Sequence, residues 1–67
     1  MTQQNRAGGQ AEALRRMGAL IAARRRALGL TQKQLAARLL VSDKAVSKWE
    51  LGGGYPDPAL LAPLAAA

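Results

Sequence analysis

The segment 31–50, TQKQLAARLLVSDKAVSKWE, constrains the fold of this chain more than any other stretch. Leu35 and Leu39 are four residues apart, and Val46 and Trp49 are three apart, so each pair lies on one face of a helix. Val41 falls between the two pairs, where its side chain can fill the angle between the helices. The spacing predicts two short helices that are joined by a tight turn and bury these side chains together.

The other positions of the segment divide into one small residue and a polar set. Ala36 follows Leu35 directly, and its small side chain would let a second helix approach closely. The polar set consists of short or basic side chains of the kind that contact phosphates and base edges in nucleic-acid complexes. Its members are Gln32, Lys33, Ser42, Asp43, Lys44, Ser47 and Lys48.

Helix boundaries are also readable in this segment. Thr31 and Gln34 have the spacing of a capping box, which predicts that the first helix begins at Gln32. Ser42 can cap the second helix, which we expect from about Asp43 to Leu51. Gln32 lies in the first turn of the first helix, where free backbone N–H groups and the helix dipole favour a phosphate.

The words LTQKQLA and VSDKAVSKWE, with a trailing G-x-x-x-P from Gly52 to Pro56, resemble the phage-repressor family of helix-turn-helix domains (lambda repressor and Cro-like, XRE-type). The resemblance runs from about Met17 to Ala67. It implies an all-α fold, a compact bundle of four short helices with the helix-turn-helix at residues 32–50. The family's usual fifth helix has no counterpart in this sequence.

The resemblance also assigns roles to residues of the polar set and the core. It implies that the second helix enters the major groove of double-stranded DNA and places Asp43, Lys44, Ser47 and Lys48 against base edges. Phosphate contacts are expected from Gln32, Ser42 and Lys33. Structural roles fall to Ala36, Val46, Trp49 and an ion pair between Arg25 and Glu50.

Asp43 has two interpretations that the sequence leaves open. Its carboxylate can accept a hydrogen bond from cytosine N4 in the major groove. Alternatively, it interacts favourably with the dipole of the helix in whose first turn it lies.

Three features depart from the family pattern. Leu40 stands in the turn where relatives carry glycine or asparagine, because the backbone tends to be left-handed there. Gly52, Gly53 and Gly54 replace the polar and basic residues that many relatives use on the DNA backbone. Arg24 occupies a core-facing position of the first helix, and we expect its stem to lie along the core while its charge reaches outward.

The sequence around this segment predicts one domain. Residues 1–10 are polar and include Gly8 and Gly9, so we expect a disordered basic arm, followed by the helix-turn-helix domain over 11–67. A first helix is predicted from Ala11 to Leu28 and is closed by Gly29 in a left-handed cap. A last helix begins at Asp57-Pro58, and Pro63 should kink or shorten it.

Composition limits the chemistry that this chain can perform. The net charge is +6 and the pI is about 11.3, which indicates a polyanionic partner, nucleic acid before an acidic membrane surface. The chain has no cysteine, no histidine and four carboxylates, so the usual metal ligands, nucleophiles and general bases are missing. We therefore expect no enzyme activity, no cofactor, no metal and no membrane insertion, in a cytoplasmic bacterial protein.

Two functions are compatible with these features. The first is sequence-specific binding of double-stranded DNA as a transcriptional regulator, with a homodimer on two half-sites as the usual arrangement. The second is an antitoxin-like or adaptor helix-turn-helix whose main partner is another protein. The positive charge and the two lysines favour DNA, whereas Leu40 and the glycine-rich loop favour the protein partner.

Overall fold

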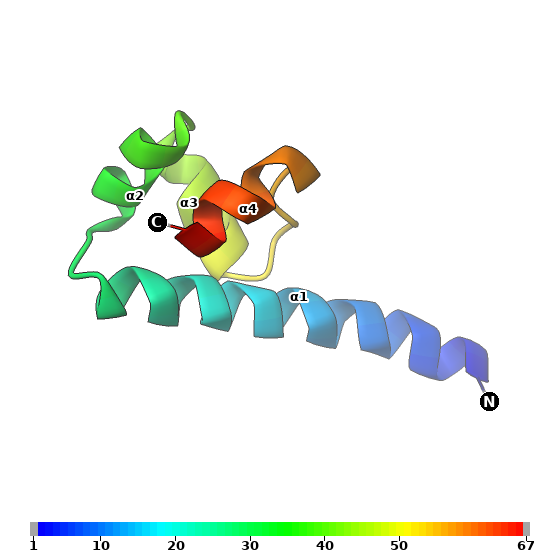
Figure 1. Cartoon of the computed structure of the whole chain (residues 1–67). Helices are drawn as coiled ribbons and strands as arrows, with labels where there is room; N and C mark the ends of the chain where they lie inside the picture. The colour runs from blue at the N-terminus through cyan, green and yellow to red at the C-terminus, as the bar shows by residue number, and fades with distance from the viewer. Residues whose placement is uncertain (1, 67) are drawn as a thin grey trace.

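A computed structural model describes the backbone of residues 2–66 and the side chains of residues 9–66. The all-α prediction is confirmed. Helix α1 spans Thr2–Ala27, α2 spans Gln32–Leu39, α3 spans Asp43–Glu50, and the 3-10 turn η1 (Pro58–Leu60) leads into α4 (Leu61–Ala66). The three short helices gather over the C-terminal part of α1, whose N-terminal part extends past them (Figure 1).

The first helix is longer than expected. The sequence predicted a disordered arm over 1–10 and a helix from Ala11, but α1 begins at Thr2 and is 26 residues long. Glutamine, arginine and alanine are good helix formers, and a helix extends more easily from a packed segment than it starts anew. The side chains of residues 1–8 lie outside the described residues, so the structure does not address the arm's contacts.

The core lies where α1, α2 and α3 meet. Its fully buried members include Val46 and Leu35, with exposed fractions of 0% and 1%, and Trp49 is 7% exposed. The predicted faces of α2 and α3 therefore point inward. Ala36 is also buried, as a small side chain between packed helices should be. The complete cluster is Ile21, Leu35, Ala36, Leu39, Val46, Trp49 and Leu64.

A glycine that the sequence analysis did not single out permits the crossing of α1 and α3. Gly18 lies in α1 and is buried. A Cβ atom at this position would collide with the carbonyl oxygen of Trp49 and come within 2.7 Å of that of Glu50. The C-terminal end of α3 therefore rests directly on the backbone of α1, which holds the whole of α3 at a fixed distance from it.

Three helices end in the same way. The residue after the last turn is left-handed at Gly29 (φ 71°), Leu40 (φ 60°) and Gly52 (φ 79°). In each case the amide of that residue and the amide of the next one return to carbonyls of the last helical turn, which is the Schellman arrangement. Leu40 thus adopts the conformation that relatives reach with glycine or asparagine, and the tight turn between α2 and α3 is kept.

The last part of the chain is a short helix in two pieces. Asp57 caps the 3-10 turn by accepting a hydrogen bond from the amide of Ala59, at 2.9 Å from its Oδ1. Pro63 has no N–H for the carbonyl four residues earlier, and the α-helical part is confined to Leu61–Ala66. Leu64 is buried against the core, whereas Leu61 stays exposed.

Candidate nucleic-acid interface

The outer face of α3 presents the side chains that the sequence assigned to base contacts. Asp43, Lys44 and Lys48 are exposed, and Ser47 is half-buried beside them. Val46, on the opposite face of the same helix, is completely buried. Because α3 is fixed by its apolar face, it can offer two lysines, a hydroxyl and a carboxylate to a partner without unpacking.

The N-terminal ends of α2 and α3 are shaped by their caps. Thr31 and Gln34 form the predicted capping box, with hydrogen bonds of 3.0 Å to the amide of Gln34 and 2.8 Å from the amide of Thr31. At α3, the hydroxyl oxygen of Ser42 accepts from the amide of Ala45 at 3.1 Å. That hydroxyl keeps its own hydrogen, which remains available for donation to a phosphate. Lys33 is exposed in the first turn of α2.

A partly buried ion pair ties the two helices of the motif to α1. Nε of Arg25 donates to Glu50 at 2.7 Å, and a second guanidinium nitrogen donates to the other carboxylate oxygen at 3.1 Å. The side chains are only 14% and 7% exposed. The remaining guanidinium nitrogen donates to the carbonyl of Leu30 at 2.9 Å. Arg25 thereby fastens the end of α3 both to α1 and to the connection that leads into α2.

Gln32 makes a contact within the domain that the sequence did not predict. The sequence assigned its side chain to a DNA phosphate, but its amide nitrogen donates to Glu50 at 3.0 Å. The reason is proximity to a charged acceptor that Arg25 already holds in place. One N–H of the side-chain amide is therefore used within the domain, and the second remains for a phosphate.

The same contacts set the protonation of the pair. Burial acts to raise the pKa of Glu50, but hydrogen bonds from Arg25 and Gln32 and the charges of Arg25 and Arg26 outweigh it, so this pKa lies below its ordinary value. The hydrogen bond to Glu50 raises the pKa of Arg25. Both groups are charged at neutral pH, which keeps the end of α3 fixed.

Arg24 behaves as its position in the helix predicted. Its side chain is exposed, and a terminal guanidinium nitrogen donates to the carbonyl oxygen of Ala65 at 2.9 Å. A cation at the C-terminal end of a helix interacts favourably with the helix dipole. Arg24 therefore connects α1 to the end of α4.

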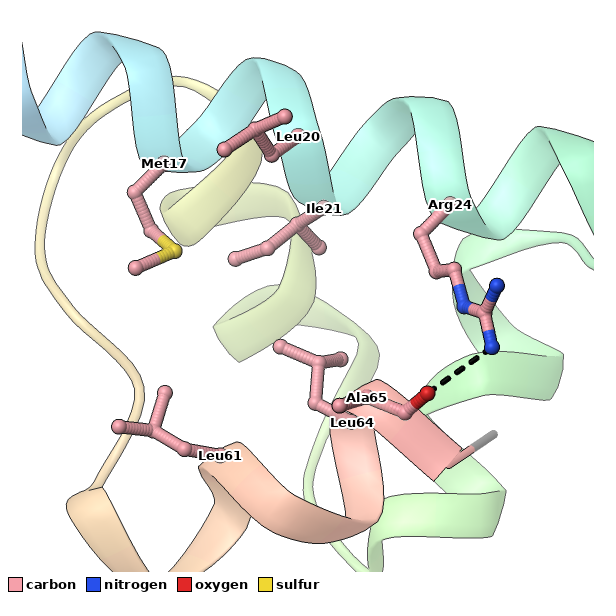
Figure 2. A pocket seen from close by; sticks show the side chains of 7 residues that line it. All are labelled: Met17, Leu20, Ile21, Arg24, Leu61, Leu64 and Ala65. Atoms are coloured by element: carbon pink, nitrogen blue, oxygen red, sulfur yellow. Dashed lines mark hydrogen bonds between the residues drawn. The ribbon is translucent and has the colours of Figure 1, made fainter.

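A second surface feature is an apolar groove of about 210 Å³ between α1 and α4. Figure 2 shows Met17, Leu20 and Ile21 on one side and Leu61 and Leu64 on the other, with Arg24 and Ala65 at one end. Apart from the guanidinium, these side chains carry no titratable group, so the groove offers no acid, base or nucleophile. Its volume is below that of typical ligand pockets.

Within the described part of the chain, no three histidine, cysteine, aspartate or glutamate residues are close enough to hold a metal ion. None of the helices described is both long and apolar enough to cross a bilayer. The exposed face of α3, with its two lysines, is the candidate site.

Comparison with known proteins supports this choice. A protein family described as helix-turn-helix matches residues 21–67, which is more than half of the chain. The chain belongs to this helix-turn-helix family. The resemblance of its sequence to helix-turn-helix domains is thus confirmed. Helices α2 and α3 are the two helices that give the family its name.

One relative and the search of solved structures complete the comparison. The HTH-type transcriptional activator BcrR of Enterococcus faecalis is 64% identical over 28 residues. Those residues are 42% of this helix-turn-helix chain but only 14% of BcrR, so the chain corresponds to a small part of that relative. No solved structure matches the chain.

Proposed function

We propose that this helix-turn-helix domain binds double-stranded DNA in a sequence-specific manner and acts in the regulation of transcription. The main support is that α3 has two different faces. Val46 and Trp49 are buried on one face, and Lys44 and Lys48 are exposed on the other. An α-helix fits the major groove, and lysines can donate to O6 and N7 of guanine there. Membership of the helix-turn-helix family and the similarity to a transcriptional activator support the same function.

Phosphate contacts would position this helix on the duplex. We assign them to Lys33, to the hydroxyl of Ser42, and to the remaining side-chain N–H of Gln32. The first-turn amides of α2 and α3 point out of their helices and add donors for phosphate oxygens. With a net charge of +6, long-range attraction to DNA would bring the domain to this position.

The direct test is a selection of bound duplexes from a random DNA library. We expect enrichment of a defined sequence, and a palindromic winner would also indicate that two domains bind as a dimer. Enrichment of unrelated sequences to the same extent would exclude sequence-specific binding.

Replacement of Lys44 by alanine should weaken binding to the selected duplex by about 1 to 3 kcal/mol and relax the preference at one base pair. Lys33→Ala is the matched control, because a lysine on phosphate contributes equally to all sequences. It should lower the affinity for selected and scrambled duplexes alike and reduce the dependence on salt by about one counterion. Fluorescence anisotropy measures the affinity of each variant for the selected and the scrambled duplex. If Lys44→Ala and Lys33→Ala change these affinities in the same way, the assigned roles are wrong.

The alternative function, an antitoxin-like or adaptor module, is favoured by the exposed leucines. Leu40 and Leu51 are 91% and 80% exposed, and a protein that docked over either of them would remove apolar surface from water. The selection experiment distinguishes the two functions, because a module that serves a protein partner would show no sequence preference for DNA.

A further inference from the structure

The glycine-rich loop after α3 lies against the side chain of Lys48. A Cβ atom on Gly53 would come within 2.8 Å of the Cγ atom of Lys48 and within 3.2 Å of its carbonyl oxygen. On Gly54, the nearest atoms would be Cε at 3.5 Å and Nζ at 4.0 Å, which are ordinary contacts. The stem of Lys48 therefore runs along this loop and uses space that only glycine leaves at position 53.

The backbone explains why these two residues meet. Gly52 is left-handed, and the amide of Gly53 donates to the carbonyl of Lys48 at 2.8 Å. Of the two hydrogen bonds in this Schellman motif, it is the one that spans more residues of the chain, and it brings Gly53 over the side chain that begins the last turn of α3. Gly53 does not itself have a positive φ, so an L-residue is allowed there by the backbone.

The position of the close contact determines its consequence. Cγ is the second carbon of the Lys48 side chain, and its position is set by the first side-chain torsion angle, so a Cβ atom on residue 53 would force a change in that angle. Staggered side chains change this angle in steps of about 120°, which moves the terminal ammonium by several ångströms. The direction of Lys48 is therefore coupled to the absence of a side chain at position 53.

We propose that Gly53 is a specificity-determining residue, which acts on DNA recognition by setting the direction of Lys48. This inference rests on the proposed DNA-binding function. The loop contributes no cation of its own, and instead gives the lysine of α3 a defined path toward the base edges. A larger residue at position 53 changes which base pair the ammonium reaches without changing the charge of the protein.

The experiment is a double-mutant cycle with the intact chain, made of wild type, Gly53→Ala, Lys48→Ala and the double variant. Affinities are measured for the duplex obtained by selection and for a scrambled duplex of equal length. Gly53→Ala and Lys48→Ala should each weaken binding to the selected duplex by about tenfold, and the double variant should also lose about tenfold rather than about a hundredfold. Gly53→Ala keeps the charge, so its affinity for the scrambled duplex should stay within about twofold of wild type.

Gly54→Ala is the matched control in the same loop. Because its Cβ atom would meet Lys48 only at ordinary contact distances, we expect binding within about twofold of wild type. Equal losses for Gly53→Ala and Gly54→Ala would indicate a general effect of loop stiffness and overturn the inference.

The outcomes separate this inference from the function on which it rests. If wild type does not prefer the selected duplex over the scrambled one, the proposed function fails and the inference fails with it. If wild type shows the preference but the two single losses multiply in the double variant, only the inference is overturned. Circular dichroism shows whether each variant folds. If both variants with alanine at position 53 are unfolded, the contact with the carbonyl oxygen of Lys48, and not the contact with its side chain, excludes larger residues there. That result also overturns the inference.

Discussion

Leu40 holds a backbone conformation that most side chains avoid. Its φ is 60° and its ψ is 41°, while its side chain is 91% exposed. A left-handed conformation costs a non-glycine residue about 1 to 2 kcal/mol, and an exposed leucine regains little of that by packing. Leu40 therefore lowers the stability of the domain while it keeps the turn of the motif. The ends of α1 and α3 reach the same conformation with Gly29 and Gly52, which avoid this strain.

Replacement of Leu40 by glycine should stabilise the domain by about 1 kcal/mol, because the relief of strain exceeds the added entropy of the unfolded chain. In a domain of this size, that would raise the melting temperature by about 4 to 8 °C. The control is Leu51→Gly, at an exposed leucine with an ordinary φ of −86°, which should destabilise by about 0.5 to 1 kcal/mol. A loss of stability in both variants would contradict the account of the turn.

Glu50 should make the stability of the domain depend on acid pH. Its pKa is lower in the folded protein than in the unfolded chain, where a glutamate titrates near pH 4.3. The stabilisation is therefore fully present above that pH and is lost as the pH falls through the folded pKa, since the unfolded chain then binds the proton more readily. The chain has no histidine and only four carboxylates, which leaves few other contributions.

Urea unfolding at a series of pH values between about 3 and 7 measures this dependence. We expect the free energy of unfolding of wild type to fall below about pH 5, and that of Glu50→Gln to change less over the same range. An equally steep fall for Glu50→Gln would show that the ion pair is not responsible.

At the scale of the helices, α1 and α3 cross with their backbones in close contact. Gly18 brings two backbones together at the end of α3, next to the ion pair of Arg25 and Glu50. Gly18 has no side chain that would keep the two helices apart, and the ion pair beside it holds them together. The direction of α3, and with it the position of its lysines, depends on this junction.

Gly18→Ala should therefore destabilise the domain by about 1 to 3 kcal/mol, although alanine favours a helix, because the added methyl group forces α1 and α3 apart. Gly9→Ala is the matched control on the same helix. A Cβ atom there meets nothing within 4 Å, so the higher helix propensity of alanine should leave stability unchanged or raise it. Thermal unfolding of both variants checks this, and equal stability of the two would contradict the close crossing.

At the scale of the whole molecule, much of the arrangement followed from sequence patterns. The spacing of Leu35, Leu39, Val46 and Trp49 predicted both faces of the motif, and the caps at Thr31 and Ser42 predicted where its helices begin. These predictions succeed because they depend on residues close together in the chain. Together with the family resemblance, they were enough to locate the candidate site.

Features that depend on distant parts of the chain were missed. Gly18 looks like any helical glycine until the end of α3 lies on it, and the hydrogen bond from Gln32 to Glu50 joins residues that are 18 positions apart in the chain. The extension of α1 to Thr2 was missed because the polar residues and the paired glycines suggested disorder. The contacts of Asp43, Lys44, Ser47 and Lys48 with bases stay predictions.

The salt dependence of binding to the selected and scrambled duplexes tests the central claim most directly. We predict that the logarithm of each binding constant falls linearly with the logarithm of salt concentration as counterions are released, and that the selected duplex is bound more tightly at each concentration. The preference should shrink when Lys44 is replaced by alanine. Equal affinities for the two duplexes at every salt concentration would contradict the claim that α3 reads a DNA sequence.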